Sequence, residues 1–230
     1  MTSFYQNRVV EILLDKGADV NAITDLHGPG LYEASATGDV QILQILLDKG
    51  ADVDARHRWR TRSSALQVAA YEGHNRIIEI LLENGADATG ALQEAIGKGH
   101  EKTVQILLEH GVDVNARDKG AKGLSALQVA AIKGHNRVIE ILLKHGADAT
   151  GALQEATGKR HGEAVQTLLE HGVDVNNAEC EYGSALLVAV VVGNRRIAEA
   201  LLDQTASILA KGGCSVALNA LEGASRCGYD

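Results

Sequence analysis

The sequence predicts an all-α solenoid of about seven stacked helix–turn–helix units with β-hairpin-like fingers, two of them missing. A leucine-rich segment recurs: LLDKGADVNA at residues 13–22 returns in edited form at Leu46, Leu81, Leu107, Leu142, Leu168 and Leu201. Its spacing, near 33 residues, is typical of a unit that is too small to fold alone. Each copy also shows the apolar periodicity of a helix. We therefore expect one domain over residues 1–230, with partial repeats at 1–22 and 213–230 and full repeats at 28–55, 63–88, 89–116, 124–149, 150–177 and 183–210.

Residues 63–90 illustrate one unit. Ser64 is expected to cap a first helix, ALQVAAYEG, which Gly73 ends. The segment NRIIEILLEN then forms a second helix with an apolar stripe at helical spacing: Ile77, Ile78, Leu81 and Leu82. Gly85 ends this helix because glycine adopts the left-handed conformation at low cost. The repeat is thus two short antiparallel helices followed by a loop.

The spacing between copies is irregular in an ordered way. Successive LL pairs lie 33, 35, 26, 35, 26 and 33 residues apart. We call the hairpin-like loop that joins one repeat to the next a finger. The two short steps lack the residues of a finger, so we expect the repeats that begin near Thr89 and Thr150 to have no finger. Those two threonines are then expected to serve as N-caps.

A larger unit explains the alternation. Residues 64–115 match residues 125–176 at 41 of 52 positions, which indicates a duplicated pair of repeats. The copies differ most at Tyr71/Ile132, Glu72/Lys133, Asn84/His145, Ile96/Thr157, Gly99/Arg160 and Glu101/Gly162.

The pattern (A/V)LQ-x-A, then GH(N/E), then (I/V)LL-x-x-GAD-(V/A)(N/T) closely resembles the ankyrin repeat over nearly the whole chain. The SALQ and GALQ starts are most similar to arrays of filamentous fungi. They depart from the family's T-P-L-H at Ala65 and Gln67, and again at Ala126 and Gln128. The resemblance implies that first helices line a concave binding groove and that the array is a protein-binding sensor or scaffold within a longer chain.

Composition narrows the function. A net charge of −8 disfavours binding to nucleic acid or anionic membrane. No run approaches the roughly 20 apolar residues of a membrane span. The three cysteines do not follow the repeat and are expected to be ordinary thiols of an intracellular protein, cytoplasmic or nuclear.

The histidines and glutamates do not predict chemistry. Equivalent histidines occupy neighbouring repeats, about 8–10 Å apart, whereas metal ligands converge to about 2 Å from one ion. Glu33, Glu94 and Glu155 lie on alternate repeats, roughly 20 Å apart, too far for a pair of catalytic carboxylates. We predict no enzyme, no metal site and no cofactor, and assign the histidines to turn hydrogen bonds and helix capping.

The finger RHRWRTR, Arg56 to Arg62, is the least repeat-like segment and is basic in an acidic chain. Alternation would place its arginines on one side, with His57 and Trp59 on the other. Either this is a solvated loop whose tryptophan covers a helix, or it contacts an acidic or phosphate-bearing partner protein. We predict these partner-binding residues: Arg58, Trp59, Arg60, Arg62, Tyr71, Glu72, Lys98, Ile132, Lys133, Lys159 and Tyr182.

Two alternatives remain open. The gaps over Glu94 and Glu155, where fingers are missing, could hold a small molecule or an unusual active site. Both ends of the array lack a complete repeat, which favours either a longer natural chain or self-association through an end.

Overall fold

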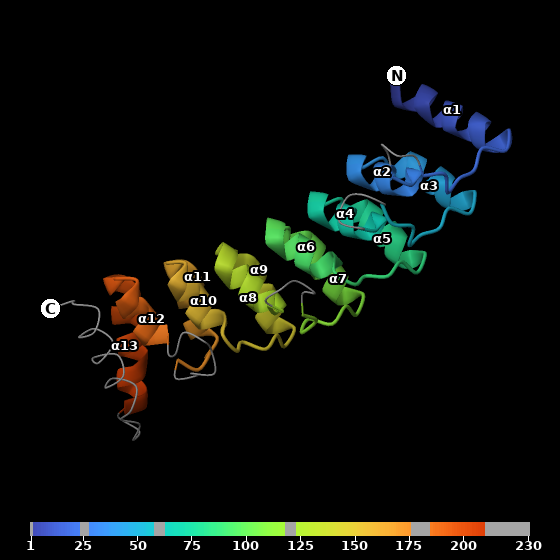
Figure 1. Ribbon diagram of the computed structural model, residues 1–230. Coiled ribbons are helices and arrows are strands. Elements are labelled where there is room, and N and C mark those ends of the chain that lie inside the picture. The colour runs from blue at the N-terminus through green and yellow to red at the C-terminus, as the bar shows by residue number, and fades with distance from the viewer. Residues whose placement is uncertain (1, 24–27, 58–62, 118–122, 176–184, 210–230) are drawn as a thin grey trace. The chain divides into compact units, whose positions relative to one another are not determined.

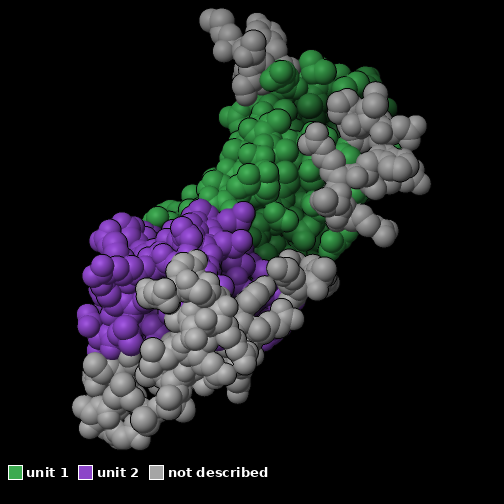
Figure 2. Space-filling view, turned by 60° about the vertical axis from the view of Figure 1, so that its left-hand side comes forward, with its two compact units in different colours: residues 1–113 green, residues 114–230 purple. Residues whose placement is uncertain are grey.

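The computed structural model describes residues 2–23, 28–57, 63–117, 123–175 and 185–209, and for residues 2–5 and 205–209 only the backbone. The chain divides into two compact units, Met1–Asp113 and Val114–Asp230 (Figure 2). The described part is helical, apart from two isolated β-bridges at the finger bases. The predicted all-α solenoid is confirmed, whereas a single domain over residues 1–230 stays a prediction.

Unit 1 is a stack of antiparallel helix pairs. The first helices of its repeats form one layer and the second helices form another (Figure 1). Its helices are α1 (Thr2–Asp15), α2 (Gly30–Thr37), α3 (Val40–Asp48), α4 (Ala65–Glu72), α5 (Asn75–Glu83), α6 (Ala91–Lys98) and α7 (Glu101–Glu109). Helix α1 begins at Thr2 and packs on α3, in the layer of second helices. Its Val9, Ile12 and Leu13 side chains are each about half exposed.

Unit 2 repeats this arrangement. First helices α8 and α10 pack on each other, as do α10 and α12, while α11 packs between α9 and α13 in the other layer. The helices are α8 (Ala126–Lys133), α9 (Asn136–Lys144), α10 (Ala152–Gly158), α11 (Gly162–Glu170), α12 (Ala185–Val191) and α13 (Arg195–Leu209). In each unit we call the edge where first helices end and second helices begin the turn edge.

The LL signature supplies the core of every described repeat after α1, whose Leu13 is exposed. The first leucine of the pair is fully buried in five repeats and almost fully in a sixth: Leu81, Leu107, Leu142, Leu168 and Leu201, and then Leu46. The second leucine is only half-buried at Leu82, and Ile80 completes the buried stripe of α5 instead. Small alanines at Ala69 and Ala95 are also fully buried, which lets neighbouring first helices approach closely.

The SALQ segments begin first helices with complete capping boxes, which confirms the prediction that Ser64 is an N-cap. The Ser64 hydroxyl accepts a hydrogen bond from the Gln67 amide, and the Gln67 side chain accepts one from the Ser64 amide at 2.8 Å. Ser125 and Gln128 repeat this arrangement in unit 2. The Gln67 side-chain amide also donates to the Thr89 carbonyl of the next repeat at 2.9 Å. Glutamine at the family's histidine position therefore joins two repeats.

Replacing Ser64 with alanine is expected to lower the free energy of unfolding by about 1 kcal/mol, because a free amide of α4 loses its acceptor. Ser64→Thr keeps the hydroxyl and is expected to lose much less. Urea unfolding followed by circular dichroism measures both. Equal losses in the two variants would argue against the cap.

The short links lack a finger, but their N-caps differ from the prediction. The residues before α6 and α10 are Gly90 and Gly151, at φ values of 82° and 78°, so Thr89 and Thr150 are not the caps. The physical reason is a competing turn: the Asp87 carboxylate accepts from the Thr89 amide at 2.9 Å, and Asp148 does the same for Thr150. Asp148 accepts hydrogen bonds from the backbone amide and, with a smaller effect, from the side chain of Thr150, and both lower the pKa of Asp148 below its ordinary value.

The GADVN motif joins successive repeats in each unit. In unit 1 the Asn21 side chain accepts a hydrogen bond from the Asp52 amide, and Asp54 accepts one from Asp87, both at 2.8 Å. In unit 2 the Asn115 side chain accepts from Asp148 at 2.8 Å. The polar residues of the motif therefore join the loops that follow the second helices, while the leucines before the motif fill the core. In each unit we call the edge formed by these loops the loop edge.

Candidate functional site

One histidine series joins neighbouring repeats. The imidazole Nε2 of His74, His100 or His161 lies 2.9–3.3 Å from a carbonyl of the preceding first helix, at Ala36, Tyr71 and Ile132 respectively. Each ring also covers the glycine that ends that helix, so a Cβ there would lie within 3 Å of the ring. The structural role predicted for this series is confirmed at these three residues, whereas Nε2 of His135, the fourth member, is buried and has no hydrogen-bond partner among the described residues.

The second histidine series caps its own helices. The Nδ1 atoms of His110, His145 and His171 lie 2.8–2.9 Å from the carbonyl four residues earlier. Within the described residues, no group of three or more histidine, cysteine or carboxylate side chains could hold a metal ion. Neither series therefore gathers into a site.

The three glutamates occupy structural positions. Glu33 accepts a hydrogen bond from the Gly28 amide at 3.2 Å, in the link before α2. Glu94 and Glu155 are half-buried in the first turns of α6 and α10, where the helix dipole favours a carboxylate. A pocket above either one stays a prediction. Two hollows of the described residues lie elsewhere, beside α1 and between α11 and α13.

The base of the basic finger follows the predicted alternation. Arg56 pairs with Ser64 in an antiparallel bridge, is exposed and lies 3.5 Å from the Asp87 carboxylate. His57 is 5% exposed and packs against Tyr32, with ring centroids 4.9 Å apart. Arg58, Trp59, Arg60, Arg62 and Tyr182 lie outside the described residues, so their predicted roles stay predictions.

In unit 1 the predicted residues Tyr71, Glu72 and Lys98 meet at the turn edge. The Lys98 ammonium lies 4.0 Å from the centroid of the Tyr71 ring, which joins the ends of α4 and α6. The Tyr71 side chain raises the pKa of Lys98, and the carboxylates of Glu72 and Glu94 act in the same direction. Tyr71 nevertheless remains 40% exposed, so an aromatic face and a charge are both held in place and open to a partner.

The corresponding residues of unit 2 are more basic. Lys133 and Lys159 are exposed at the ends of α8 and α10, and Ile132 stands half-buried where unit 1 has Tyr71. Neither lysine side chain makes an ion pair or hydrogen bond within the described part of the chain. The cation–aromatic contact of unit 1 therefore has no counterpart at this position.

The sequence-based prediction missed Arg160. Its backbone has a φ of 63°, and it is the one non-glycine residue with positive φ in the described ranges. Its guanidinium donates to the Val192 carbonyl at the end of the next first helix. The signal was visible in the aligned repeats, because Gly99 occupies this position in the other copy.

The fold and these repeat-to-repeat contacts define a helical repeat protein whose exposed side chains project from an ordered stack. A family model for ankyrin repeats in three copies matches residues 1–90, 31–118 and 87–152. The chain belongs to the ankyrin-repeat family. Domains of this family generally mediate protein–protein interactions.

Solved structures agree with this assignment. The human ASB11 ankyrin repeat domain matches with a TM-score of 0.74 and 25% identity, over 86% of this chain and 94% of that one. The ankyrin repeat domain of Bcl-3, a member of the IkappaB protein family, matches with a TM-score of 0.72 and 26% identity, over 86% and 91% of the two chains. A search of curated protein sequences gave no match. Across the described residues, no helix has the length and apolar character needed to cross a membrane.

Proposed function

We propose that this chain is a non-enzymatic protein–protein interaction module that works inside the cell and binds its partner through the ends of its first helices and through its fingers. The observation that carries the proposal is the Tyr71–Lys98 pair. Its two side chains come from neighbouring first helices and are already in contact at 4.0 Å. Because the pair is ordered before binding, little side-chain entropy is lost when a partner covers it.

The residue types support the same conclusion. Tyrosine is enriched at binding hot spots because it offers a large apolar face and a hydroxyl at low entropic cost. Tyr71 is 40% exposed although aromatic residues are scarce in this chain, at 3%. Glu72 lies beside it, so a partner with an apolar group next to a basic one would fit this surface.

Removing the aromatic face is expected to weaken partner binding. In Tyr71→Ala we expect the dissociation constant to rise about 5–30-fold, the range of a moderate hot spot. The partner is first captured from the native host with the wild-type chain, and affinities are then measured by biolayer interferometry. Trp59→Ala combined with Arg60→Ala tests the finger in the same assay.

The control is Gln105→Ala, which changes an exposed residue on the second helix α7. Circular dichroism confirms that each variant is folded. If Tyr71→Ala and the finger variant both bind as the wild type does, the proposed surface is wrong.

A further inference from the structure

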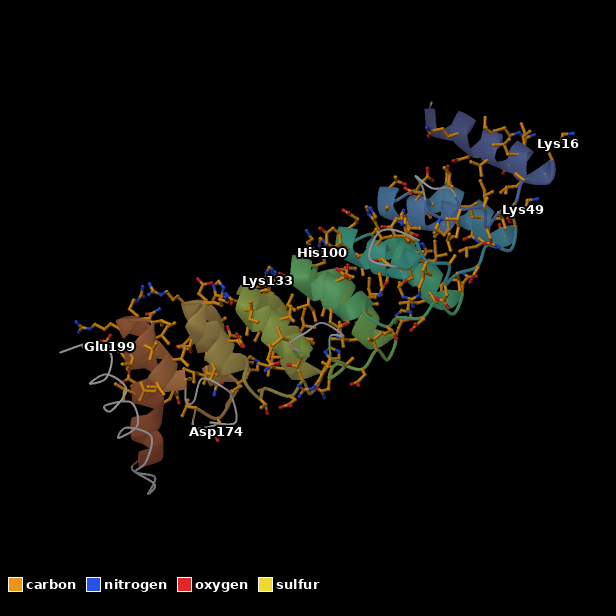
Figure 3. All side chains as sticks on the ribbon, in the orientation of Figure 1. Lys16, Lys49, His100, Lys133, Asp174 and Glu199 are labelled. Carbon is orange, nitrogen blue, oxygen red and sulfur yellow. The ribbon has the colours of Figure 1, made fainter. Side chains whose placement is uncertain are left out.

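The turn edge of unit 2 carries a concentration of positive charge. Five exposed basic residues lie at the ends of α8 and α10 and at the start of α13: Lys133, Lys159, Arg160, Arg195 and Arg196. We call this set the basic edge. Figure 3 shows Lys133 at the turn edge of the unit and Asp174 at the opposite edge. The acidic residues Glu170 and Asp174 lie at the end of α11 and in the loop after it, whereas Glu163 in the first turn of α11 is the carboxylate of that helix at the basic edge.

Few carboxylates act on the basic edge. Glu199 pairs with Arg195 at 2.7 Å, and Glu163 accepts a hydrogen bond from the Asn136 side chain at 2.7 Å. Lys133, Lys159 and Arg196 form no ion pair within the described part of the chain. Their charges are available to an external anion.

Arg160 is held at this edge in a costly conformation. A left-handed backbone costs a residue with a side chain roughly 1–2 kcal/mol more than it costs glycine. The equivalent position is glycine in the other described repeats: Gly38, Gly73, Gly99, Gly134 and Gly193. One hydrogen bond to the Val192 carbonyl offsets part of this cost. The hydrogen bond holds this guanidinium at the end of α12.

A hollow adjoins the basic edge between α11 and α13. Its volume is about 530 Å³, and residues lining it include Arg160, Glu163, Asn194, Arg196 and Ile197. Two arginines, one glutamate and the first turns of two helices therefore line one space, together with apolar side chains. Such a mixture suits a carboxylate on a short aliphatic chain better than a fully hydrated phosphate.

We propose that the basic edge binds an acidic segment of a partner protein, with one of its aspartate or glutamate carboxylates seated in the hollow between Arg160 and Arg196. This inference rests on the proposed interaction function and names the partner's chemistry for unit 2. The net charge of −8 disfavours a phosphate polymer, because the rest of the chain would repel it. A short acidic peptide touches only the basic edge.

The test uses the full chain and a fluorescein-labelled oligoglutamate peptide in fluorescence anisotropy. The variant Lys133→Glu with Arg160→Gly installs the residues that the duplicated copy carries, Glu72 and Gly99, so the fold is known to accept them at these positions. We expect the dissociation constant to rise about tenfold at low salt. Binding by the wild type is expected to weaken as salt is raised, and an oligoglutamine peptide is expected not to bind.

The matched control is Lys102→Glu with Lys16→Gln, which makes the same change in net charge at exposed positions of unit 1. It is expected to bind the peptide nearly as the wild type does. A second edge variant, Lys159→Glu with Arg196→Glu, leaves Arg160 in place and is expected to lose binding as well.

Equal weakening in the control would overturn the proposal, since the effect would then be one of net charge. So would tighter binding to a single-stranded oligonucleotide than to oligoglutamate. If the peptide does not bind, but the captured partner does and Tyr71→Ala weakens the binding of that partner, this inference alone is wrong. Capture of no partner at all removes the proposed function, whatever the peptide does.

Discussion

Leu81→Ala is expected to lower the free energy of unfolding by about 3 kcal/mol, a value within the range for a fully buried leucine. Leu81 is 0% exposed in α5, which packs against α4 and α7. Removing its isobutyl group therefore leaves a cavity in the packed core around α5. Because each repeat is stabilised by its neighbours, the loss weakens the stack on both sides of α5.

The adjacent leucine of the same motif is the control. Leu82 has the same side chain and lies in the same helix, but it is only half-buried. Leu82→Ala is therefore expected to cost about 1 kcal/mol, since less apolar surface returns to water. Urea unfolding, followed by circular dichroism with a common slope, compares the two variants. Equal losses would contradict the assignment of the first leucine to the core.

The core was predictable from sequence because it depends on local periodicity. The LL pairs, the helix-ending glycine Gly73 and the Ser64 cap each follow from residues within one repeat. The prediction that Thr89 caps α6 was wrong because it considered only the threonine side chain. In the structure the Asp87 carboxylate accepts a hydrogen bond from the Thr89 amide, and Gly90 precedes the helix instead. Two local motifs competed, and the sequence did not say which would prevail.

The candidate site was less predictable because its contacts join different repeats. Tyr71 and Lys98 were both selected from sequence, but their contact depends on how far α6 is offset from α4. That offset arises from helix packing, through small residues such as Ala69 and Ala95. Arg160 could have been found, because it interrupts a series of glycines whose left-handed backbone each repeat requires.

The glycines of the turn edge are expected to be far less replaceable than those of the loop edge. Gly73 and Gly85 have nearly the same φ, 79° and 80°. The conformational strain of an alanine backbone in this region, about 1–2 kcal/mol, is therefore expected to be the same at both positions. A Cβ at Gly85 would meet nothing within 4 Å, whereas at Gly73 it would lie 2.9 Å from Nδ1 of His100. The two variants therefore separate backbone strain from crowding.

Gly73→Ala is expected to cost about 2–4 kcal/mol, because the His100 ring must move and its hydrogen bond to the Tyr71 carbonyl, 2.9 Å long, is lost as well. Gly85→Ala is expected to cost only the backbone strain. In Gly73→Ala with His100→Ala the crowding is gone, so the double variant should lose about 1 kcal/mol less than the sum of the single losses. Urea unfolding of Gly73→Ala, His100→Ala and their double variant measures this coupling, and Gly85→Ala is compared in the same assay. Strict additivity, or equal losses at Gly73 and Gly85, would show that the histidine ring does not enforce glycine at the end of the first helix.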